Sequence, residues 1–205
     1  MRLYYHPLSS NSRRALLTST HLGLDLEKLR VDLSGGAQKA PEYVRLNPNG
    51  KVPLLVDGAL NLWESCAIMQ YLADVGRGED IYPREVAARA DVNRWLFWSA
   101  SHFAPALAPF IRERVSKRVV AGAGAPDPAE IARAEAALPA TAMLLDAHLA
   151  QNDWLAQQRL TLADYALAAP LMHLDAAQIP LGDYAHVLAW FARIRASKAW
   201  VETNP

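Results

Sequence analysis

Residues 51–63 read KVPLLVDGALNLW, two short apolar runs on either side of Asp57-Gly58. Asp-Gly is typical of the tight turn between two antiparallel strands, so this stretch predicts a β-hairpin. After the hairpin, apolar residues recur with helical spacing from Ala67 to Val75 and stop at Gly76. That spacing predicts a helix that buries one broad face.

The residues before the hairpin predict a strand, a helix and another strand. Leu3–Tyr5 is a short β run, and a helix follows from Ser12 with Gly23 as its C-terminal cap. Leu29–Leu33 alternates with the period of two that is expected of a strand. Together with the hairpin and its helix, these elements predict an α/β unit over residues 1–76 with a four-stranded mixed sheet.

The rest of the chain predicts helices only. A charged, Gly-containing segment, residues 77–84, is expected to be a linker to an all-helical domain over residues 85–205. The predicted helices of this domain cover residues 86–118, with Pro105 and Pro109 bending or interrupting the helix, and residues 129–150, 162–174 and 184–196. Residues 119–128 are expected to break the helical run. Thr161 and Asp164 have the spacing of a helix cap, which predicts a folding role and no catalysis.

Composition places the chain among globular proteins. Hydrophobic residues make up 52% and charged residues 20% of its 205 residues, which excludes a disordered chain. Lys and Arg number 21, as do Asp and Glu, so the formal net charge is zero and offers no broad positive field to a nucleic acid. No apolar run approaches the ~18 residues of a membrane span. We therefore expect neither a nucleic acid nor a membrane as partner.

The single cysteine, Cys66, allows no intramolecular disulfide and no Cys-based zinc site. We expect its thiol to be packed in the interior. The six histidines are scattered without the spacing of metal ligands, so no metal is expected. Cysteine usage and the absence of a targeting segment favour a cytoplasmic protein.

Three short motifs carry candidate chemistry. They are Ser9-Ser10-Asn11-Ser12 between the first strand and helix, Gly50-Lys51-Val52-Pro53 ahead of the hairpin, and Glu64-Ser65 at the start of a helix. Each motif alone is common as a helix cap or a turn. Their order within one small α/β unit, followed by an all-helical half, is much more specific.

With these motifs the chain resembles the soluble glutathione transferase superfamily over nearly its whole length. The resemblance rests on Tyr5-His6-Pro7-Leu8-Ser9 with Arg13-Arg14, Leu46–Pro53, Asp57-Gly58, Leu62–Ile68 with Tyr71-Leu72, and Leu162-Ala163-Asp164. It implies a thioredoxin-like N-terminal α/β domain, an all-α C-terminal domain and a homodimer. It also implies a bacterial enzyme of the serine type, with theta- and phi-like features and some beta-like ones.

The resemblance implies that the first domain binds glutathione as co-substrate. Val52, ahead of a cis Pro53, would pair its backbone with the cysteinyl backbone of the ligand. Glu64 would hold the ligand's ammonium, and Ser65 at a helix N-terminus would hold a carboxylate.

Two lysines complete the expected glutathione site. Lys51 and Lys39 would reach the glycyl carboxylate, Lys39 by its likeness to a basic pair of the phi-type members. In this chain Gln38 replaces the first residue of that pair.

Two serines are candidates for activating the glutathione thiol. A free thiol with a pKa of about 8.5 is mostly protonated at neutral pH, and a hydroxyl that donates a hydrogen bond to the sulfur stabilises the thiolate. Ser9, four residues before Arg13, matches the serine of theta- and phi-type transferases and is favoured. Ser10 matches the catalytic cysteine of beta-type members and remains the alternative, while Asn11 is a further candidate to direct its amide toward the sulfur.

A small apolar electrophile is the expected second substrate. Its pocket is predicted between the domains, against the bent helix that carries Trp98, His102 and Phe103. Two other functions stay open. One is reduction of peroxides or disulfides with glutathione, and the other is a binding module that has lost catalysis.

Overall fold

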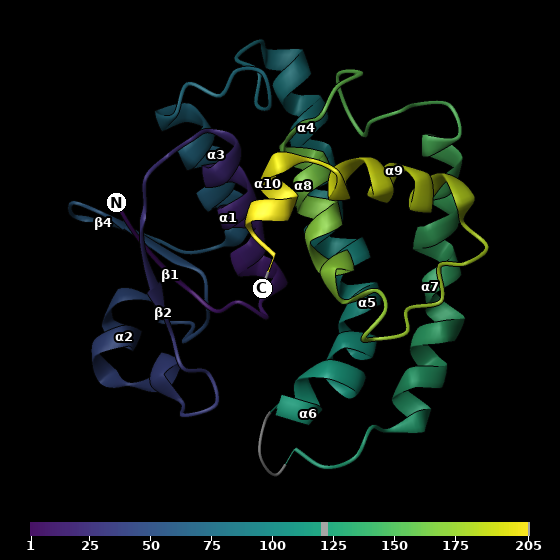
Figure 1. The fold of residues 1–205 in the computed structure, drawn as a ribbon, viewed down its shortest axis with the longest axis horizontal. Helices are drawn as coiled ribbons and strands as arrows, with labels where there is room; N and C mark the ends of the chain where they lie inside the picture. Colours follow the sequence, from purple (N-terminus) through teal and green to yellow (C-terminus); the bar gives the residue numbers. More distant parts are fainter. Residues whose placement is uncertain (120–122, 205) are drawn as a thin grey trace. The chain divides into compact units, whose positions relative to one another are not determined.

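The chain divides into two compact units. The computed structural model describes residues 1–119 and 123–204 (Figure 1). The first unit joins Met1–Pro83 to the C-terminal segment that starts at Ser197, and the second unit is Arg84–Ala196. The first unit is therefore built from two stretches of sequence that lie far apart.

A four-stranded mixed sheet forms the centre of the first unit. Its spatial order is β2-β1-β3-β4, with β1 parallel to β2 and antiparallel to β3, and with β3 and β4 forming a hairpin. The strands are β1 (Arg2–Tyr5), β2 (Glu27–Arg30), β3 (Leu54–Asp57) and β4 (Leu60–Leu62). The helical elements are α1 (Ser10–His21), η1 (Ala37–Lys39), α2 (Pro41–Leu46), α3 (Ser65–Val75) and α10 (Lys198–Glu202).

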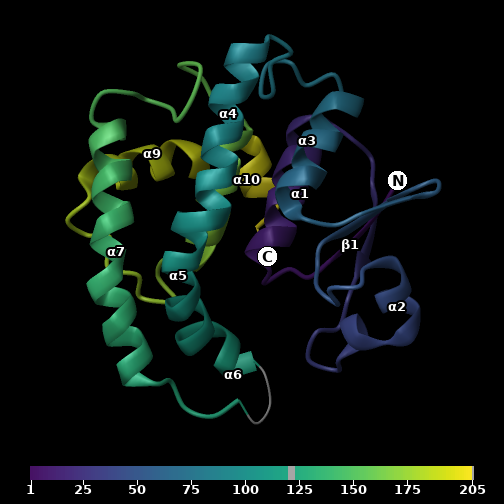
Figure 2. The same ribbon diagram turned by 180° about the vertical axis from the view of Figure 1, so that it is seen from behind.

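Helices cover both faces of this sheet. On one face, Leu3 and Leu55 pack with Ala15 of α1 and Ile68 of α3. On the other face, strand residues pack against Tyr43 of α2. Figure 2 shows α2 on one side of β1, with α1 and α3 on the other. This layered unit confirms the thioredoxin-like fold class predicted from the sequence.

The second strand lies earlier in the chain than the sequence predicts. The expected range was Leu29–Leu33, whereas β2 is Glu27–Arg30, because its parallel register with β1 starts at Arg2 opposite Glu27. Asp32 already belongs to a turn, where its carboxylate accepts hydrogen bonds from the backbone of the next residues. The alternation of apolar residues therefore continues past the end of the strand.

The predicted hairpin is confirmed, but its turn is Gly58-Ala59, one residue later than predicted, because Asp57 still pairs with Leu60 at the end of β3. Gly58 has φ 56°. The helix after it, α3, begins at Ser65. The sequence predicts no helix between Leu33 and the hairpin, but this segment holds the short elements η1 and α2. The helix α10, of five residues, was not predicted either.

The second unit is helical throughout its described secondary structure, apart from an isolated bridge between Ala156 and Arg159. Its helical elements are α4 (Val86–Trp98), η2 (Ser99–Phe103), α5 (Ala104–Ile111), η3 (Arg112–Ser116), α6 (Lys117–Val119), α7 (Pro128–Leu149), α8 (Leu162–Ala168), η4 (Ala169–His173) and α9 (Ala185–Arg195). Residues 120–122 of the predicted break at 119–128 lie outside the described part of the chain. Within the described part, no helix is both long and apolar enough to cross a membrane.

Proline shapes two of these helical runs. Pro105 stands in the first turn of α5 and Pro109 inside it, and π-helical turns, η2 and η3, flank this helix. Proline has no backbone N–H to donate, so the α-helical hydrogen-bond ladder is interrupted around it. The same cause explains η4, a 3₁₀ helix with a proline in its first turn, where the sequence predicts continuous α-helix over residues 162–174.

Asp164 is a buried carboxylate that accepts hydrogen bonds from three parts of the second unit. Its side chain is fully buried, and one carboxylate oxygen accepts from the backbone N–H (2.8 Å) and hydroxyl (3.0 Å) of Thr161. The predicted cap at the start of α8 is therefore confirmed. The other oxygen accepts from Leu155 N–H at 3.1 Å and from Trp190 Nε1 of α9 at 2.9 Å. Burial raises the pKa of this carboxyl to about 6, against the effect of its hydrogen bonds.

We predict that Asp164→Ala lowers the free energy of unfolding by about 3 kcal/mol or more. The substitution leaves buried backbone and indole N–H donors without partners, and each such donor costs about 1–3 kcal/mol. Urea denaturation followed by circular dichroism measures the change. The exposed Asp183 provides a matched control, and Asp183→Ala should stay within about 0.5 kcal/mol of the parent. Equal effects of the two substitutions would contradict the assignment.

Glu113 of η3 holds the residue that precedes α7. Its carboxylate is 1% exposed and accepts from Lys117 Nζ, from Arg112 Nε at 2.9 Å and from the backbone N–H of Asp127 at 2.8 Å. The Lys117 ammonium is the main cause that lowers the pKa of Glu113 to about 2. A carboxyl with a lowered pKa stabilises the folded state above its unfolded pKa, and loses this effect as the pH falls through its folded pKa.

Glu113→Gln should therefore destabilise the protein at neutral pH and have little effect in acid. We expect the stability difference from the parent to shrink as the pH falls from about 4.5 to about 2. Thermal unfolding at a series of pH values measures it. Glu135→Gln is the matched control, because Glu135 is half-exposed in its pair with Arg114 and such pairs contribute little. A constant difference across this pH range would refute the prediction.

Candidate functional site

Six of the predicted site residues line one small pocket in the first unit. They are Asn11, Lys51, Val52, Pro53, Glu64 and Ser65, and the pocket volume is about 50 Å³. Asn47, Asn49 and Trp63 complete the lining, which does not include Ser9, Ser10 or Lys39. The structure thus brings together the beginning of α1, the segment before β3 and the beginning of α3.

The segment before β3 is held by polar side chains. Asn47 is 1% exposed, and its amide nitrogen donates to the Lys51 carbonyl at 2.7 Å. The Tyr43 hydroxyl donates to the same carbonyl at 2.7 Å, and burial raises the pKa of Tyr43 to about 12, which keeps this donor protonated. The peptide bond between Val52 and Pro53 is cis, as the sequence resemblance implies. Asn47 was not among the predicted site residues, although it positions the backbone of this segment.

Lys39 lies against the same segment without lining the pocket. A Cβ built on Gly50, which has φ 55°, would be 2.9 Å from Lys39 Nζ. The ammonium is therefore next to the loop that carries Lys51, whose own side chain is exposed. Both lysines present positive charge on this side of the first unit.

The start of α3 combines a strained residue with a buried hydroxyl. Glu64 has φ 70° and ψ 112°, outside the usual regions for a residue with a Cβ. Ser65, the first residue of α3, is 5% exposed and its hydroxyl lies 3.4 Å from Asn11 Oδ1. The helix N-terminus and its backbone N–H groups favour an anion at this place.

Arg14 connects the starts of α1 and α3. Its side chain is 3% exposed and one Nη1 atom donates to Asn11 Oδ1 at 2.9 Å and to Ser65 Oγ at 3.2 Å. Burial lowers the pKa of Arg14, and Glu64 acts in the opposite direction. Arg14 was not among the predicted site residues. The signal was present, because a charged side chain on the packed face of a helix needs a polar partner.

Ser9 caps α1 and Ser10 is the first residue of that helix. The Ser9 hydroxyl accepts a hydrogen bond from Ser12 N–H at 3.2 Å, and both serines are half-buried. Within residues 1–119 and 123–204 no group accepts the Ser9 hydroxyl proton. This proton can therefore be donated to a ligand.

Cys66 follows directly on Ser65 and is half-buried. Burial is the main cause that raises the pKa of its thiol, so this thiol is protonated at neutral pH. In the described residues, His, Cys, Asp and Glu form no group of three that could hold a metal ion.

The second unit brings the three predicted electrophile-pocket residues together. The Trp98 ring is stacked on His102 (6.1 Å between centroids) and on Phe103 (5.8 Å). Phe103 is fully buried, whereas His102 is exposed and Trp98 is half-buried. Phe103 therefore packs inside the unit, and the other two rings reach its surface.

The matches to protein families decide the identity of this fold. Residues 1–74 match the N-terminal domain of glutathione S-transferases, and residues 100–198 match the C-terminal domain. The chain belongs to the glutathione S-transferase family.

Relatives in this family match nearly the full chain. Glutathione S-transferase 3 of Zea mays is 36% identical, over 99% of this chain and 92% of the relative. Glutathione S-transferase 2 of Anopheles gambiae is 33% identical, over 98% of this chain and 93% of the relative. A theta-class glutathione S-transferase from Xanthomonas axonopodis pv. citri, solved with glutathione bound, is 33% identical with a TM-score of 0.89, over 98% of this chain and 95% of that one. These transferases confirm the predicted family and fold, while bacterial origin and the serine type remain predictions.

Glu64→Gly should be more stable than Glu64→Ala by about 1 kcal/mol. Both substitutions remove the carboxylate, but only glycine adopts a positive φ without strain. Urea denaturation of the two variants measures the difference. As a control, Glu42 lies in the first turn of α2, where glycine should instead be less stable than alanine. If Glu64→Ala were as stable as Glu64→Gly, the backbone of Glu64 would not be strained.

Proposed function

We propose that this chain binds glutathione in the pocket of its first unit, stabilises the thiolate with a serine hydroxyl at the start of α1, and transfers the sulfur to an apolar electrophile. Membership of the glutathione S-transferase family supports a transferase that uses glutathione. The observation that carries the proposal is the meeting of Asn11, Val52 and Ser65 in one pocket, with Ser9 at the head of the helix that carries Asn11.

The charges of the pocket complement those of glutathione, which has two carboxylates and one ammonium. We assign the γ-glutamyl carboxylate to Ser65 and the N-terminus of α3, with the buried Arg14 cation behind them. Glu64 takes the ammonium, and the backbone of Val52 pairs with the cysteinyl residue. Lys39 and Lys51 attract the glycyl carboxylate from the side of Gly50.

The serine acts as a hydrogen-bond donor. Ser9 Oγ accepts from Ser12 N–H, which leaves its own proton for the sulfur and strengthens it as a donor. Hydrogen bonds to charged groups contribute about 1.5–3 kcal/mol, equivalent to about one to two units of thiol pKa. Ser10 is the alternative donor, and Asn11, whose amide oxygen accepts from Arg14, is a further candidate through its amide N–H groups.

In the reaction the thiolate attacks an electrophilic carbon and forms a carbon–sulfur bond. The electron pair leaves with a departing group, or stays on the electrophile and takes a proton from water. We assign contact with the apolar electrophile to Trp98 and His102, with Phe103 as the buried support beneath Trp98. Conjugation of reactive apolar compounds suits a role in detoxification.

A reductase that attacks its substrate with a cysteine of its own has less support. Its chemistry needs a protein thiolate, and Cys66 is a half-buried thiol whose pKa is raised. Reduction of peroxides or disulfides by the bound glutathione itself would use the same site, and assays with a peroxide or a disulfide in place of the electrophile distinguish it from conjugation.

A homodimer in the cytoplasm is the proposed state. Each unit exposes large apolar side chains, Leu60 and Trp63 in the first and Phe97 in the second. Exposed apolar side chains of this size are typical of protein interfaces. The proposed domains remain residues 1–76 and 85–205, with a linker at 77–84.

Titration of the ultraviolet absorbance of the bound thiolate tests the mechanism. We expect a thiol pKa about one unit or more below that of free glutathione in the parent protein. Ser9→Ala should raise it toward the free value, and Ser9→Thr, which keeps the hydroxyl, should restore it. Turnover of 1-chloro-2,4-dinitrobenzene should fall by about tenfold or more in Ser9→Ala.

Three results separate the possible explanations. Ser116→Ala, in the second unit, is the matched control and should leave the thiol pKa unchanged. A larger effect of Ser10→Ala than of Ser9→Ala would move the role to Ser10. An unshifted thiol pKa with normal glutathione binding would remove the serine mechanism and favour a binding module.

A further inference from the structure

The segment that leads from β1 into α1 is a tight turn. Ser9 N–H donates to the His6 carbonyl at 3.0 Å, so residues 6–9 form a β-turn with Pro7 in its second position. Proline is favoured in that position because its ring fixes φ near the value that the turn needs. The turn therefore sets the place at which the chain enters α1, and Ser9 is its last residue.

Two further hydrogen bonds close this turn into a triangle. His6 N–H donates to the Ser12 hydroxyl oxygen at 3.2 Å, and Ser12 N–H donates to Ser9 Oγ at 3.2 Å. Together with the bond between Ser9 and His6, each of these residues is bonded to the other two, and we call this arrangement the His6–Ser9–Ser12 triangle. Ser12 is fully buried. The Ser9 hydroxyl oxygen is therefore held by a donor that is itself fixed in the interior of the first unit.

The imidazole of His6 supplies a fourth hydrogen bond. Its Nδ1 accepts from the N–H of Leu8, two residues further on, at 3.2 Å. Asn and Asp side chains make the same contact in Asx-turns. This N–H belongs to the peptide between Pro7 and Leu8, and the orientation of this central peptide separates the common types of β-turn. The His6 side chain thus fixes the part of the turn that the triangle does not reach.

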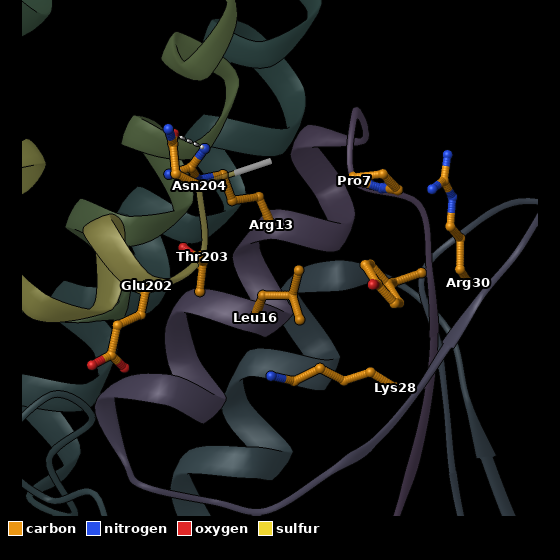
Figure 3. A pocket seen from close by; sticks show the side chains of 9 residues that line it. Pro7, Arg13, Leu16, Lys28, Arg30, Glu202, Thr203 and Asn204 are labelled. Atoms are coloured by element: carbon orange, nitrogen blue, oxygen red, sulfur yellow. Dashed lines mark hydrogen bonds between the residues drawn. The ribbon is translucent and has the colours of Figure 1, made fainter.

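The imidazole accepts this bond only while Nδ1 carries no proton. Burial and then the Arg30 guanidinium lower the pKa of His6, while Asp32 acts in the opposite direction. Figure 3 shows the Arg30 guanidinium beside Pro7, the residue that follows His6. At neutral pH the imidazole is therefore uncharged, and the contact with Leu8 assigns its proton to Nε2.

The body of α1 has anchors of its own. Arg13 is 2% exposed, lies over the Trp200 ring at 3.9 Å from its centroid and donates to the Trp200 carbonyl at 2.9 Å. It also donates to Asn204 Oδ1 at 3.4 Å (Figure 3). We therefore expect the helix to keep its place when the turn changes, and with it Asn11, which lines the glutathione pocket from α1.

We propose that His6 is a positioning residue for the Ser9 hydroxyl, which it directs toward the glutathione sulfur through the Leu8 contact and the His6–Ser9–Ser12 triangle. This role rests on the proposed function, in which the Ser9 hydroxyl donates to the thiolate. Hydrogen bonds weaken steeply when the donor points away from the acceptor. A turn whose central peptide is free to rotate displaces the backbone of Ser9 and misdirects its hydroxyl. His6 makes no contact with the sulfur and acts through Ser9 alone.

Exchange of His6 for alanine and for asparagine tests this role. His6→Ala removes the acceptor, whereas His6→Asn keeps one, because an Asn side chain accepts from the N–H two residues further on. By titration of thiolate absorbance, we expect His6→Ala to raise the thiol pKa of bound glutathione by about half a unit and His6→Asn to match the parent. Below that pKa, kcat for 1-chloro-2,4-dinitrobenzene should fall about threefold in His6→Ala, with little change in the KM for glutathione.

A double variant shows whether His6 acts through Ser9. In Ser9→Ala the hydroxyl is gone, so the addition of His6→Ala should change neither the thiol pKa nor turnover any further. His186→Ala is the matched control, because His186 is an exposed histidine of the second unit. This control should match the parent in thiol pKa and in turnover.

Three results would overturn the proposal. One is a thiol pKa in His6→Ala equal to that of the parent. The second is an effect of His6→Asn as large as that of His6→Ala, because the loss of the acceptor would then not be the cause. The third is an equal effect of His6→Ala with and without the Ser9 hydroxyl, which would show that His6 does not act through Ser9.

The same titrations separate this role from the proposed function. If Ser9→Ala leaves the thiol pKa unchanged, the serine mechanism fails and the role of His6 fails with it. If Ser9→Ala raises the thiol pKa and His6→Ala does not, the serine mechanism stands and only the role of His6 is overturned.

Discussion

The buried guanidinium of Arg14 is the interaction on which the proposed site depends. It joins Asn11 near the start of α1 to Ser65 at the start of α3, so the beginnings of two helices share one hydrogen-bonded cation. Both helices pack on the same face of the sheet, and their apolar contacts bury Arg14 with them. A buried cation is tolerated only where its N–H groups have hydrogen-bond acceptors, and this requirement fixes the separation between the two helix ends. Recognition of glutathione and activation of its thiol are proposed to depend on the same geometry, one at each helix.

Much of the fold is readable from local sequence signals. The hairpin that turns at Gly58, the helix after Ala67 and the cap formed by Thr161 and Asp164 each depend on neighbours in the chain, and the structure confirms all three. The errors have a different cause. The limits of β2 are set by its register against β1, and α10 is a short helix that is stabilised by packing on α1. Neither partner is visible from the residues of the element itself.

The candidate site shows the same division. Residues that line the pocket were found as short motifs, because a ligand-facing turn or helix start has a typical local composition. The residues that hold these motifs in place, Asn47 and Arg14, were missed as members of the site. Asn47 acts through the Lys51 carbonyl and Arg14 through a helix more than fifty residues away in sequence. These contacts exist only in the folded chain, so the spacing of residues along the sequence does not predict them.

The stacking of Arg13 on Trp200 joins residues from early and late in the sequence within the first unit, and this affects the order in which the unit can fold during synthesis. Along the sequence, the whole helical unit, Arg84–Ala196, lies between the residues of the sheet and those of α10, the helix that packs on α1. On the ribosome, residues 1–83 emerge long before Trp200 does. Until then Arg13 keeps its hydration and the side of α1 that receives α10 stays uncovered. The sheet unit is thus the first to start folding and the last to finish, because its final piece is synthesised only after the helical unit is complete.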